Sequence, residues 1–471
     1  MTNEEFDPGR WTAPIRDVVA KQLYPRYSRW KDAVSSRRRE LRRHYQQGLA
    51  FRDQSRSWSD EQKYDWLLDR MRFAVRRAYT HTHYYRTQFD KIGFNPRSTF
   101  GFDEFAKLPV LEREDILEAG GGLISQRIPR ESLRMDSTGG SSGTPTRIWV
   151  GPEEHSWRES GSDWYANRAG LVRGDRLGYL WGHHLDPTSQ STLRERLYSF
   201  VNNTEWFDCF RLDSATLDRY HERMEVYRPK CIIAYASALG ALAERVLERG
   251  LNPGYPTNCV ITGAEKLFLV QRKAAEAAFG RPVRERYGAR DVGLIGFQTE
   301  PDLSYAYDVD WANVLVEPEF SSGRASILIT KLHADGMPMI RYRIGDVGLF
   351  PPGSKPGCPV LSLLEVVGRE LERIWLPDGS WIEGEFGPHM LKDYPVREYM
   401  LRQRPDYSIE VQIAPRTGFS DLHEKQIVRT LSKNLPGLAV STVLVDRVPR
   451  TRANKLRPVI SEVNTSRGMA R

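Results

Sequence analysis

The chain of 471 residues is long enough for more than one domain and a sizeable hydrophobic core. Its composition, 40% hydrophobic and 28% charged, is typical of a soluble globular protein. No apolar run reaches the length of a membrane span, and the acidic, polar start is not typical of a secretory signal. We therefore expect a cytoplasmic protein without a membrane partner.

The net charge of +8 is compatible with an anionic ligand or with nucleic acid. Much of the excess is local, in Arg37–Arg39 and Arg42–Arg43 of a predicted helix. Because no nucleic-acid-binding motif accompanies these residues, we favour a solvated helix face and expect no nucleic-acid partner. The cysteines are scattered, without a Cys-x-x-Cys pair, which indicates reduced and mostly buried thiols: Cys209, Cys231, Cys259 and Cys358.

The first part of the chain, from about Trp11 to Phe89, is predicted to be helical, since apolar residues recur at helical spacing in Tyr64–Val75. Phe94–Arg97 breaks this pattern. His81 and His83 lie two positions apart, which is wrong for one helix face, so a helix-end or surface role is favoured over a metal site.

A loop rich in glycine and hydroxyl residues follows at Asp136–Thr146, and Arg147–Val150 after it is predicted to be a strand. Such a loop presents many backbone N–H groups and hydroxyls to an anion, and glycine allows close approach of a phosphate. The alternative is a flexible surface loop. The composition of the loop alone does not decide between them.

Strands and helices alternate after this loop, which favours a parallel α/β sheet. The predicted strands are Arg176–Trp181, Cys231–Tyr235, Asn258–Gly263 and Val283–Tyr287. Ligands of parallel sheets bind beyond the carboxyl ends of the strands. The sequence therefore predicts a pocket at the rim formed by Trp181, Tyr235, Gly263 and Tyr287.

Short strands with turns between them begin at Val314 and indicate a β-rich subdomain, followed from Gly368 by a small α+β domain. The predicted fold class is α/β, with mixed and parallel sheets flanked by helices in a large N-terminal domain. We expect a helical extension over residues 1–100, a main domain over 101–367 and a C-terminal domain over 368–471.

The loop Thr138–Pro145 lacks the Gly-Lys-Ser/Thr ending of the Walker type and resembles the Thr-Ser-Gly-Ser/Thr-Thr-Gly-x-Pro loop of adenylate-forming enzymes. Four motifs follow in the order of that family. Thr262–Glu265 resembles Ser-Gly-x-Glu, and Tyr287–Asp291 resembles Tyr-Gly-x-x-Glu. Tyr342–Asp346 resembles Tyr-Arg-x-Gly-Asp, and Pro449–Arg457 resembles Pro-Arg-Thr-x-x-Gly-Lys-x-Arg.

Each motif alone has an ordinary explanation, such as a surface carboxylate or a turn former, but chance agreement of all five in order is implausible. The resemblance spans about Leu49 to Ile460. Within the superfamily, Met337–Arg343 and Tyr235–Leu239 resemble the branch of phenylacetate–coenzyme A ligases and ligase-like capsular polysaccharide biosynthesis proteins.

The resemblance implies ATP and Mg²⁺ as cofactors, a mobile C-terminal domain that acts as a lid, and a role for each matching residue. Lys455 would be the catalytic cation, Thr138 would act in the phosphate loop, and Asp291 would hold the metal. Asp346 would accept the ribose hydroxyls. The full set assigned to the nucleotide is Ser137, Thr138, Gly139, Gly140, Ser141, Ser142, Gly143, Thr144, Gly263, Ala264, Glu265, Tyr287, Gly288, Asp346, Arg369 and Lys455.

The implied reaction activates a carboxylic acid as an acyl-adenylate and passes it to coenzyme A or, alternatively, to an amine or hydroxyl. A third hypothesis is a nucleotide-binding protein without catalytic activity. Aromatic walls suit an aryl or otherwise unsaturated acid. The predicted pocket residues are Trp181, His183, Tyr235, Ser237 and Ala289. A homodimer is left open.

The sequence departs from the family pattern at several positions. Asp291 is one methylene shorter than the usual Glu, Thr144 replaces a frequent Lys, and Asn454 replaces Gly. Leu371–Glu372 replaces an Asp-Asp pair at the hinge. Gln298–Asp302 occupies the segment where some relatives bind zinc but contains neither cysteine nor histidine, so we expect no structural zinc.

Overall fold

The computed structural model describes residues 13–137, 146–181, 193–209, 212–299, 305–321, 324–369, 373–378, 381–383, 391, 394–435, 437–449, 457 and 459–463. The chain forms two compact units. The first comprises Met1–Ile344 and Gly348–Val366, and the second comprises Gly345–Val347 and Val367–Arg471. No helix among the described residues is long and apolar enough to cross a membrane.

The first unit begins with helices, as the apolar spacing predicts: α1 (Ala13–Val18), the π turn η2 (Val19–Leu23), α2 (Tyr24–Val34), α3 (Ser36–Ser55), α4 (Asp60–His81) and α5 (His83–Lys91). Helix α4 starts at a capping box in which the side chains of Ser59 and Gln62 each bind the backbone N–H of the other residue. His81 ends α4 and His83 begins α5, so both lie at helix ends.

An ion pair inside the first unit connects α3 to the rest of the core. Arg52 Nε lies 2.9 Å from Asp310 Oδ1, and the two side chains are 3% and 1% exposed. The same guanidinium donates to Ser160 Oγ and to the carbonyl of Gly48. Its donors are therefore directed to partners, as burial of a charged group requires.

Short elements lead from α5 to a long helix: α6 (Phe102–Phe105), α7 (Arg113–Ala119), the 3₁₀ turns η3 (Gly120–Leu123) and η4 (Arg130–Ser132), the antiparallel pair β1 (Arg134–Ser137) and β2 (Arg147–Val150), and α8 (Pro152–Arg168). The carboxylate of Asp335 caps α8 by accepting the N–H groups of Glu153 and Glu154, at 2.9 and 3.2 Å. A Cβ at Gly151 would lie 2.2 Å from Asp335 Oδ1, so only glycine fits beside this cap.

An eight-stranded sheet of order β13-β9-β8-β7-β6-β5-β3-β4 positions the predicted site. Its strands are β3 (Leu177–Trp181), β4 (Thr204–Asp208), β5 (Cys231–Tyr235), β6 (Cys259–Gly263), β7 (Val283–Ala289), β8 (Gly293–Phe297), β9 (Tyr307–Val309) and β13 (Ser362–Leu363). Strands β7, β6, β5, β3 and β4 are parallel neighbours. The predicted parallel α/β arrangement is confirmed, and β8, β9 and β13 extend it with antiparallel pairs.

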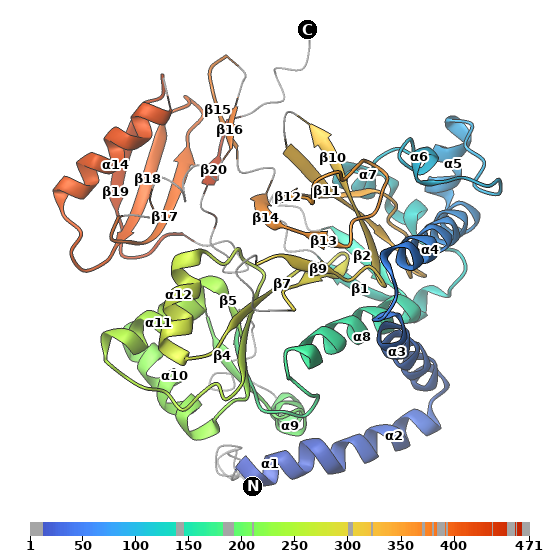
Figure 1. Cartoon of the computed structure of the whole chain (residues 1–471), viewed down its shortest axis with the longest axis horizontal. Coiled ribbons are helices and arrows are strands. Elements are labelled where there is room, and N and C mark those ends of the chain that lie inside the picture. Colours follow the sequence, from blue (N-terminus) through green and yellow to red (C-terminus); the bar gives the residue numbers. More distant parts are fainter. Residues whose placement is uncertain are drawn as a thin grey trace. The chain divides into compact units, whose positions relative to one another are not determined.

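Helices cover both faces of the parallel strands. On one face, α10 (Ser214–Tyr227), α11 (Ala236–Glu248) and α12 (Leu269–Phe279) pack side by side, and their apolar residues form one cluster with Leu180, Ile232 and Val260 (Figure 1). On the other face, Tyr165 of α8 and Ala169, which follows the helix, form a cluster with Cys231, Ile233 and residues of neighbouring strands. Helix α9 (Leu193–Val201) precedes β4.

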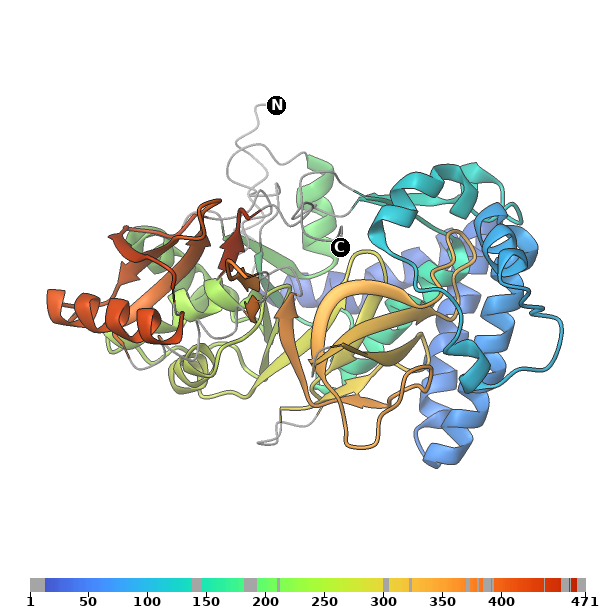
Figure 2. The same cartoon turned by 90° about the horizontal axis from the view of Figure 1, so that it is seen from above.

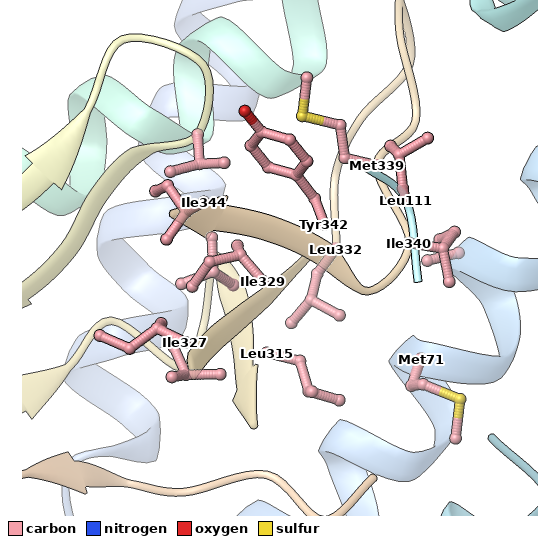
Figure 3. Packing of buried hydrophobic residues seen from close by; sticks show 14 of the residues in the cluster. Met71, Leu111, Leu315, Ile327, Ile329, Leu332, Met339, Ile340, Tyr342 and Ile344 are labelled. Atoms are coloured by element: carbon pink, nitrogen blue, oxygen red, sulfur yellow. The ribbon is translucent and has the colours of Figure 1, made fainter. Parts of the chain in front are cut away.

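The β-rich part that the sequence predicts is a four-stranded sheet of order β10-β11-β12-β14: β10 (Val314–Ser321), β11 (Arg324–Lys331), β12 (Tyr342–Leu349) and β14 (Glu365–Arg369). It shares a large hydrophobic core with α4 and α5. Figure 3 shows Met71 of α4 together with side chains of these strands, among them Ile327, Ile329 and Tyr342.

The second unit contains the α+β fold expected of the C-terminal part. Its described elements are β15 (Arg373–Trp375), β16 (Trp381–Glu383), β17 (Val396–Gln403), β18 (Ile409–Pro415), α14 (Asp421–Asn434), β19 (Val440–Leu444) and β20 (Val459–Ser461). The order β19-β18-β17-β20 forms a sheet, and α14 packs along it through Ile427 and Leu431 (Figure 2, red).

Candidate functional site

The carboxyl ends of the parallel strands lie at one edge of the sheet. Strands β3, β5 and β6 end at Trp181, Tyr235 and Gly263, and the register places Tyr235 directly opposite Gly263. Tyr287 lies near the end of β7. The structure therefore brings together the strand ends that the sequence predicts as a rim, because parallel strands all point their carboxyl ends the same way.

The turn after β6 is hydrogen-bonded to the start of α11, which follows β5. Ala264 has a φ of +68°, an uncommon conformation for a residue with a Cβ. The turn brings Glu265 Oε2 to 2.9 Å from the backbone nitrogen of Ser237, which donates the hydrogen bond. Ser237 lies in the first turn of α11, where a carboxylate is favourable. The Glu265 carboxylate thus fixes the start of α11 relative to β6.

The motif at the end of β7 forms a tight turn into β8. A Cβ at Gly288 would lie 2.5 Å from the carbonyl oxygen of Gly293, so only glycine permits this approach of the two strands. Ala289 pairs with Gly293 as the last residue of β7. Tyr287 is half-buried, with its ring centroid 6.2 Å from that of Tyr307.

Asp291, the expected metal-holding residue, is held at three points. The phenol of Tyr342 donates to its Oδ2 at 3.0 Å. The guanidinium of Arg158 on α8 donates to the carbonyl oxygens of Arg290, at 3.0 Å, and of Asp291 itself. Asp291 is only 6% exposed. The structure therefore positions both the side chain and the backbone of this turn.

Buried charges behind Asp291 compensate one another. Glu154 accepts hydrogen bonds from Arg158 and forms an ion pair with Lys331, whose nitrogen is 2.9 Å away. Burial lowers the pKa of Lys331, and the carboxylate of Glu154 opposes this effect. Arg158, Lys331, Glu154 and Asp291 together carry two positive and two negative charges, which offsets the cost of burying each of them.

A magnesium ion fits this site only as a partner of the nucleotide. Asp291 offers a single carboxylate, and the described ranges contain no group of three or more histidine, cysteine or acidic residues that could hold a metal. Mg²⁺ is commonly bound by one or two carboxylates together with substrate phosphates and waters. The donor set at Asp291 fits that mode.

The part of the rim formed by Trp181 and Tyr235 is aromatic and carries a positive charge. The rings of Trp181 and Tyr235 lie 4.3 Å apart, at an angle of 58°. The guanidinium of Arg286 lies over the Trp181 ring, 5.3 Å from its centroid. Burial raises the pKa of Tyr235 to about 12, so its phenol is neutral. Sequence reasoning missed Arg286, although its alternation with Tyr287 along β7 places it on the opposite face of the strand.

Several predicted residues lie outside the described residues: Thr138, Gly139, Gly140, Ser141, Ser142, Gly143, Thr144, His183 and Lys455. Ser137 ends β1, and Arg369 ends β14. Asp346 lies in β12 and counts with the second unit. A surface pocket of about 460 Å³ beside the start of α4 contains none of the predicted site residues.

Comparisons of the sequence relate the chain to curated proteins, while no family model matches it. Protein CapK of Staphylococcus aureus is 21% identical over 242 residues, which cover 51% of this chain and 53% of that protein. The chain thus matches about half of the length of CapK. The phenylacetate–coenzyme A ligase of Pseudomonas putida is 21% identical over 392 residues, covering 78% of this chain and 86% of the ligase. The phenylacetate–coenzyme A ligase of Aromatoleum evansii is 25% identical over 312 residues, covering 61% of this chain and 67% of that ligase.

Comparison of the structure agrees in fold. A 2-hydroxyisobutyryl-CoA ligase, solved in the postadenylation state with R3-HIB-AMP, superposes with a TM-score of 0.66 at 17% identity. The match covers 86% of this chain and 91% of that one. The same ligase in its thioesterification state, with 2-HIB-AMP and CoA, gives a TM-score of 0.53 at 18% identity, with 86% and 91% covered. The resemblance and the fold class expected from the sequence are confirmed.

Proposed function

We propose that this chain, a relative of the phenylacetate–coenzyme A ligases within the adenylate-forming enzymes, is an ATP-dependent, AMP-forming ligase that activates a carboxylic acid. The acid is aryl or otherwise unsaturated, and the acyl group passes to coenzyme A. The site residues keep the roles that the resemblance assigns to them.

One observation supports this proposal most: the Tyr287–Asp291 and Tyr342–Asp346 motifs, far apart in sequence, are joined by the hydrogen bond from Tyr342 to Asp291. The segment before Tyr342 is also fixed, because Arg341 forms a buried ion pair with Glu317, with a separation of 3.0 Å. A site that must hold a carboxylate near phosphates benefits from such preorganisation.

The first chemical step joins two anions. A carboxylate oxygen of the acid attacks the α-phosphorus of ATP, the bond to the bridging oxygen breaks, and pyrophosphate leaves with the electron pair of that bond. Charge must be neutralised for this approach, and the reactants must be aligned. Bound Mg²⁺ would supply charge neutralisation at the phosphates. In this proposal Asp291 would hold the magnesium ion, and Asp346 accepts hydrogen bonds from the ribose hydroxyls. Lys455 supplies a positive charge to the α-phosphate and the carboxylate.

The second step uses the mixed anhydride formed in the first. The thiol of coenzyme A attacks the acyl carbon, AMP departs, and the thiol proton passes to solvent. An amine or hydroxyl acceptor would follow the same course. The departures from the family pattern at Asp291, Thr144 and Asn454 are compatible with adenylation. Experiment decides between coenzyme A and the other acceptors. Retention of an acid at 291, of Asp346 and of Lys455 argues against a protein that only binds nucleotide.

The test is acid-dependent exchange between pyrophosphate and ATP across a panel of aryl, unsaturated and saturated acids. We expect exchange with a subset of aromatic acids and, after coenzyme A is added, a thioester detected by mass spectrometry. Amines and hydroxyl compounds replace coenzyme A in parallel reactions, and an amide or ester product there would identify the other acceptor class. ATP binding without exchange for any acid would contradict the ligase proposal.

A further inference from the structure

Arg286 has a defined position at the part of the rim formed by Trp181 and Tyr235. It lies on β7, and its side chain extends across Gly263 of β6, where a Cβ would lie 3.0 Å from its Cγ and 3.1 Å from its Nε. Its guanidinium lies over the ring of Trp181. The side chain is half-buried, so the charge is partly withdrawn from water.

The charge of Arg286 has no partner of opposite sign within the described part of the chain. There it makes a cation–π contact with Trp181 and neither a hydrogen bond nor an ion pair. Arg284, on the same face of β7, donates to the carbonyl of Thr299 at 3.1 Å. Arg158 and Arg341 are both paired with carboxylates. Arg286 thus differs from these three arginines, each of which donates to a protein acceptor.

Two acidic residues of α8 whose charges act on Tyr179, a residue of β3, are already engaged or face solvent. Asp163 of α8 accepts a hydrogen bond from Tyr45 and an ion pair from Arg173, at 2.6 and 2.8 Å. Glu159 of the same helix is exposed. Burial raises the pKa of Tyr179 on β3, and the charge of Arg286 opposes that rise. The positive potential of Arg286 therefore extends over the face that carries Trp181.

A cation–π contact does not use the hydrogen-bond donors of a guanidinium. Its N–H groups form a planar fork, which suits a planar carboxylate that accepts two parallel hydrogen bonds. Arg286 and Tyr287 project from opposite faces of β7. Arg286 lies with Trp181, whose ring contacts Tyr235, and the proposed function assigns these two aromatic residues to the acid.

We propose that Arg286 determines specificity, selecting aromatic acids that carry a second carboxylate distant from the one that is adenylated. This inference rests on the proposed function and narrows its substrate class. The ring of the acid packs against Trp181 and Tyr235, and its distal carboxylate binds the guanidinium of Arg286. An acid without that group leaves the half-buried cation without a partner of opposite charge among the described residues, which disfavours binding of that acid.

The test compares matched acids that differ in one group: 4-carboxyphenylacetate against 4-carbamoylphenylacetate, and terephthalate against its monoamide. Pyrophosphate release gives kcat and KM for the wild type, Arg286→Ala, Arg286→Lys and the control Arg284→Lys. We expect the wild type to favour the dicarboxylates about ten- to hundredfold in kcat/KM, mainly through KM. Arg286→Ala should lose the preference for dicarboxylates and still adenylate the amides. Arg286→Lys should keep part of this preference, and the control Arg284→Lys should keep all of it.

Equal use of both members of each pair by the wild type would overturn the inference, as would an equal loss for every acid in Arg286→Ala. The second result would place Arg286 at the reacting carboxylate. Calorimetric binding of the same acids, with thermal unfolding of each variant as a folding check, provides a readout without turnover. If no acid is adenylated, the proposed function fails. The inference about Arg286 then fails as well only if the dicarboxylates bind no more tightly than the amides.

Discussion

The phenol of Tyr342 and the carboxylate of Asp291 are joined by a hydrogen bond of 3.0 Å between residues 51 positions apart. Tyr342 is 5% exposed and Asp291 6%, so water competes little for this bond. Because Tyr342 also packs in the core with Met339 and Ile344 (Figure 3), its hydroxyl is fixed by the packing of its ring. The position of Asp291 is thereby tied to the core of the first unit.

Tyr342→Phe should keep the ring in the core and remove this bond. A hydrogen bond to a charged group contributes about 1.5–3 kcal/mol, so we expect adenylation to slow by about ten- to hundredfold. The double variant Tyr342→Phe/Asp291→Asn should be no slower than Asp291→Asn, since both changes remove the same contact. Tyr227→Phe is the control, because its phenol donates to the carbonyl of Asn203 outside the predicted site. Additive effects of the two changes would show that Tyr342 acts independently of Asp291.

Lys455 and Asp346 should have separable effects. Lys455→Ala should lower the rate of adenylation by about 10²–10³-fold with little change in ATP affinity, since its charge acts on the transition state. Asp346→Ala should instead weaken ATP binding, because the ribose contacts exist before chemistry. Single-turnover adenylation and calorimetric ATP binding measure the two quantities. Full adenylation by Lys455→Ala would remove this lysine from its assigned role.

The buried pair of Arg52 and Asp310 should dominate the stability of the contact between α3 and the core. Arg52→Met leaves the buried Asp310 without its cation and should lower the free energy of unfolding by about 3–5 kcal/mol. Adding Asp310→Leu should recover part of this loss, since no unpaired charge then remains. Urea denaturation monitored by tryptophan fluorescence measures both, with Lys63→Met as control, since it removes only an ion pair with the exposed Asp60. A loss below about 1 kcal/mol for Arg52→Met would contradict the assignment.

Asp335 should give the protein a measurable pH dependence. Burial raises the pKa of Asp335 to about 6, above its value in the unfolded chain. The native state then holds this proton more tightly, so the contribution of Asp335 to stability is greatest below about pH 4 and is lost as the pH rises to about 6. The titration of Asp335 should lower the free energy of unfolding of the wild type by about 3 kcal/mol over this window, and Asp335→Asn should abolish this decrease.

Only the difference between Asp335→Asn and the wild type isolates this carboxyl. Burial lowers the pKa of His333 to about 3, which contributes the opposite slope over the whole of this window. Chemical denaturation at a series of pH values from 4 to 8 gives the difference curve. A flat difference curve would mean that Asp335 titrates normally.

Local patterns explain why much of the fold could be predicted. The strand at Cys231–Tyr235 is a continuous apolar run buried on both faces, and its observed bounds agree with the prediction. Strand β4 was missed, because Thr204–Asp208 mixes charged, polar and aromatic residues without alternation. Its pairing with β3 is a tertiary contact that no local pattern encodes.

The site was harder to predict than the fold because its contacts cross long stretches of sequence. Motif order identified Asp291 and Tyr342 separately, but their hydrogen bond depends on how the turn after β7 meets β12. Arg286 was missed because Arg284, Glu285 and Arg286 are three consecutive charged residues, and the sequence does not tell which of them lies on the face that carries Trp181. Arg158 was missed because a basic residue on a helix is usually solvated.

The contact between Gly263 and Arg286 makes the sizes of these two positions interdependent. A methyl group at 263 would lie 3.0 Å from the Cγ of Arg286, a tight contact that requires the Arg286 side chain to shift by a few tenths of an ångström. A shorter side chain at 286 would free that volume. A larger residue at 263 should therefore be tolerated better when the side chain at 286 is shortened as well, so the volumes at these two positions of β6 and β7 are best varied together.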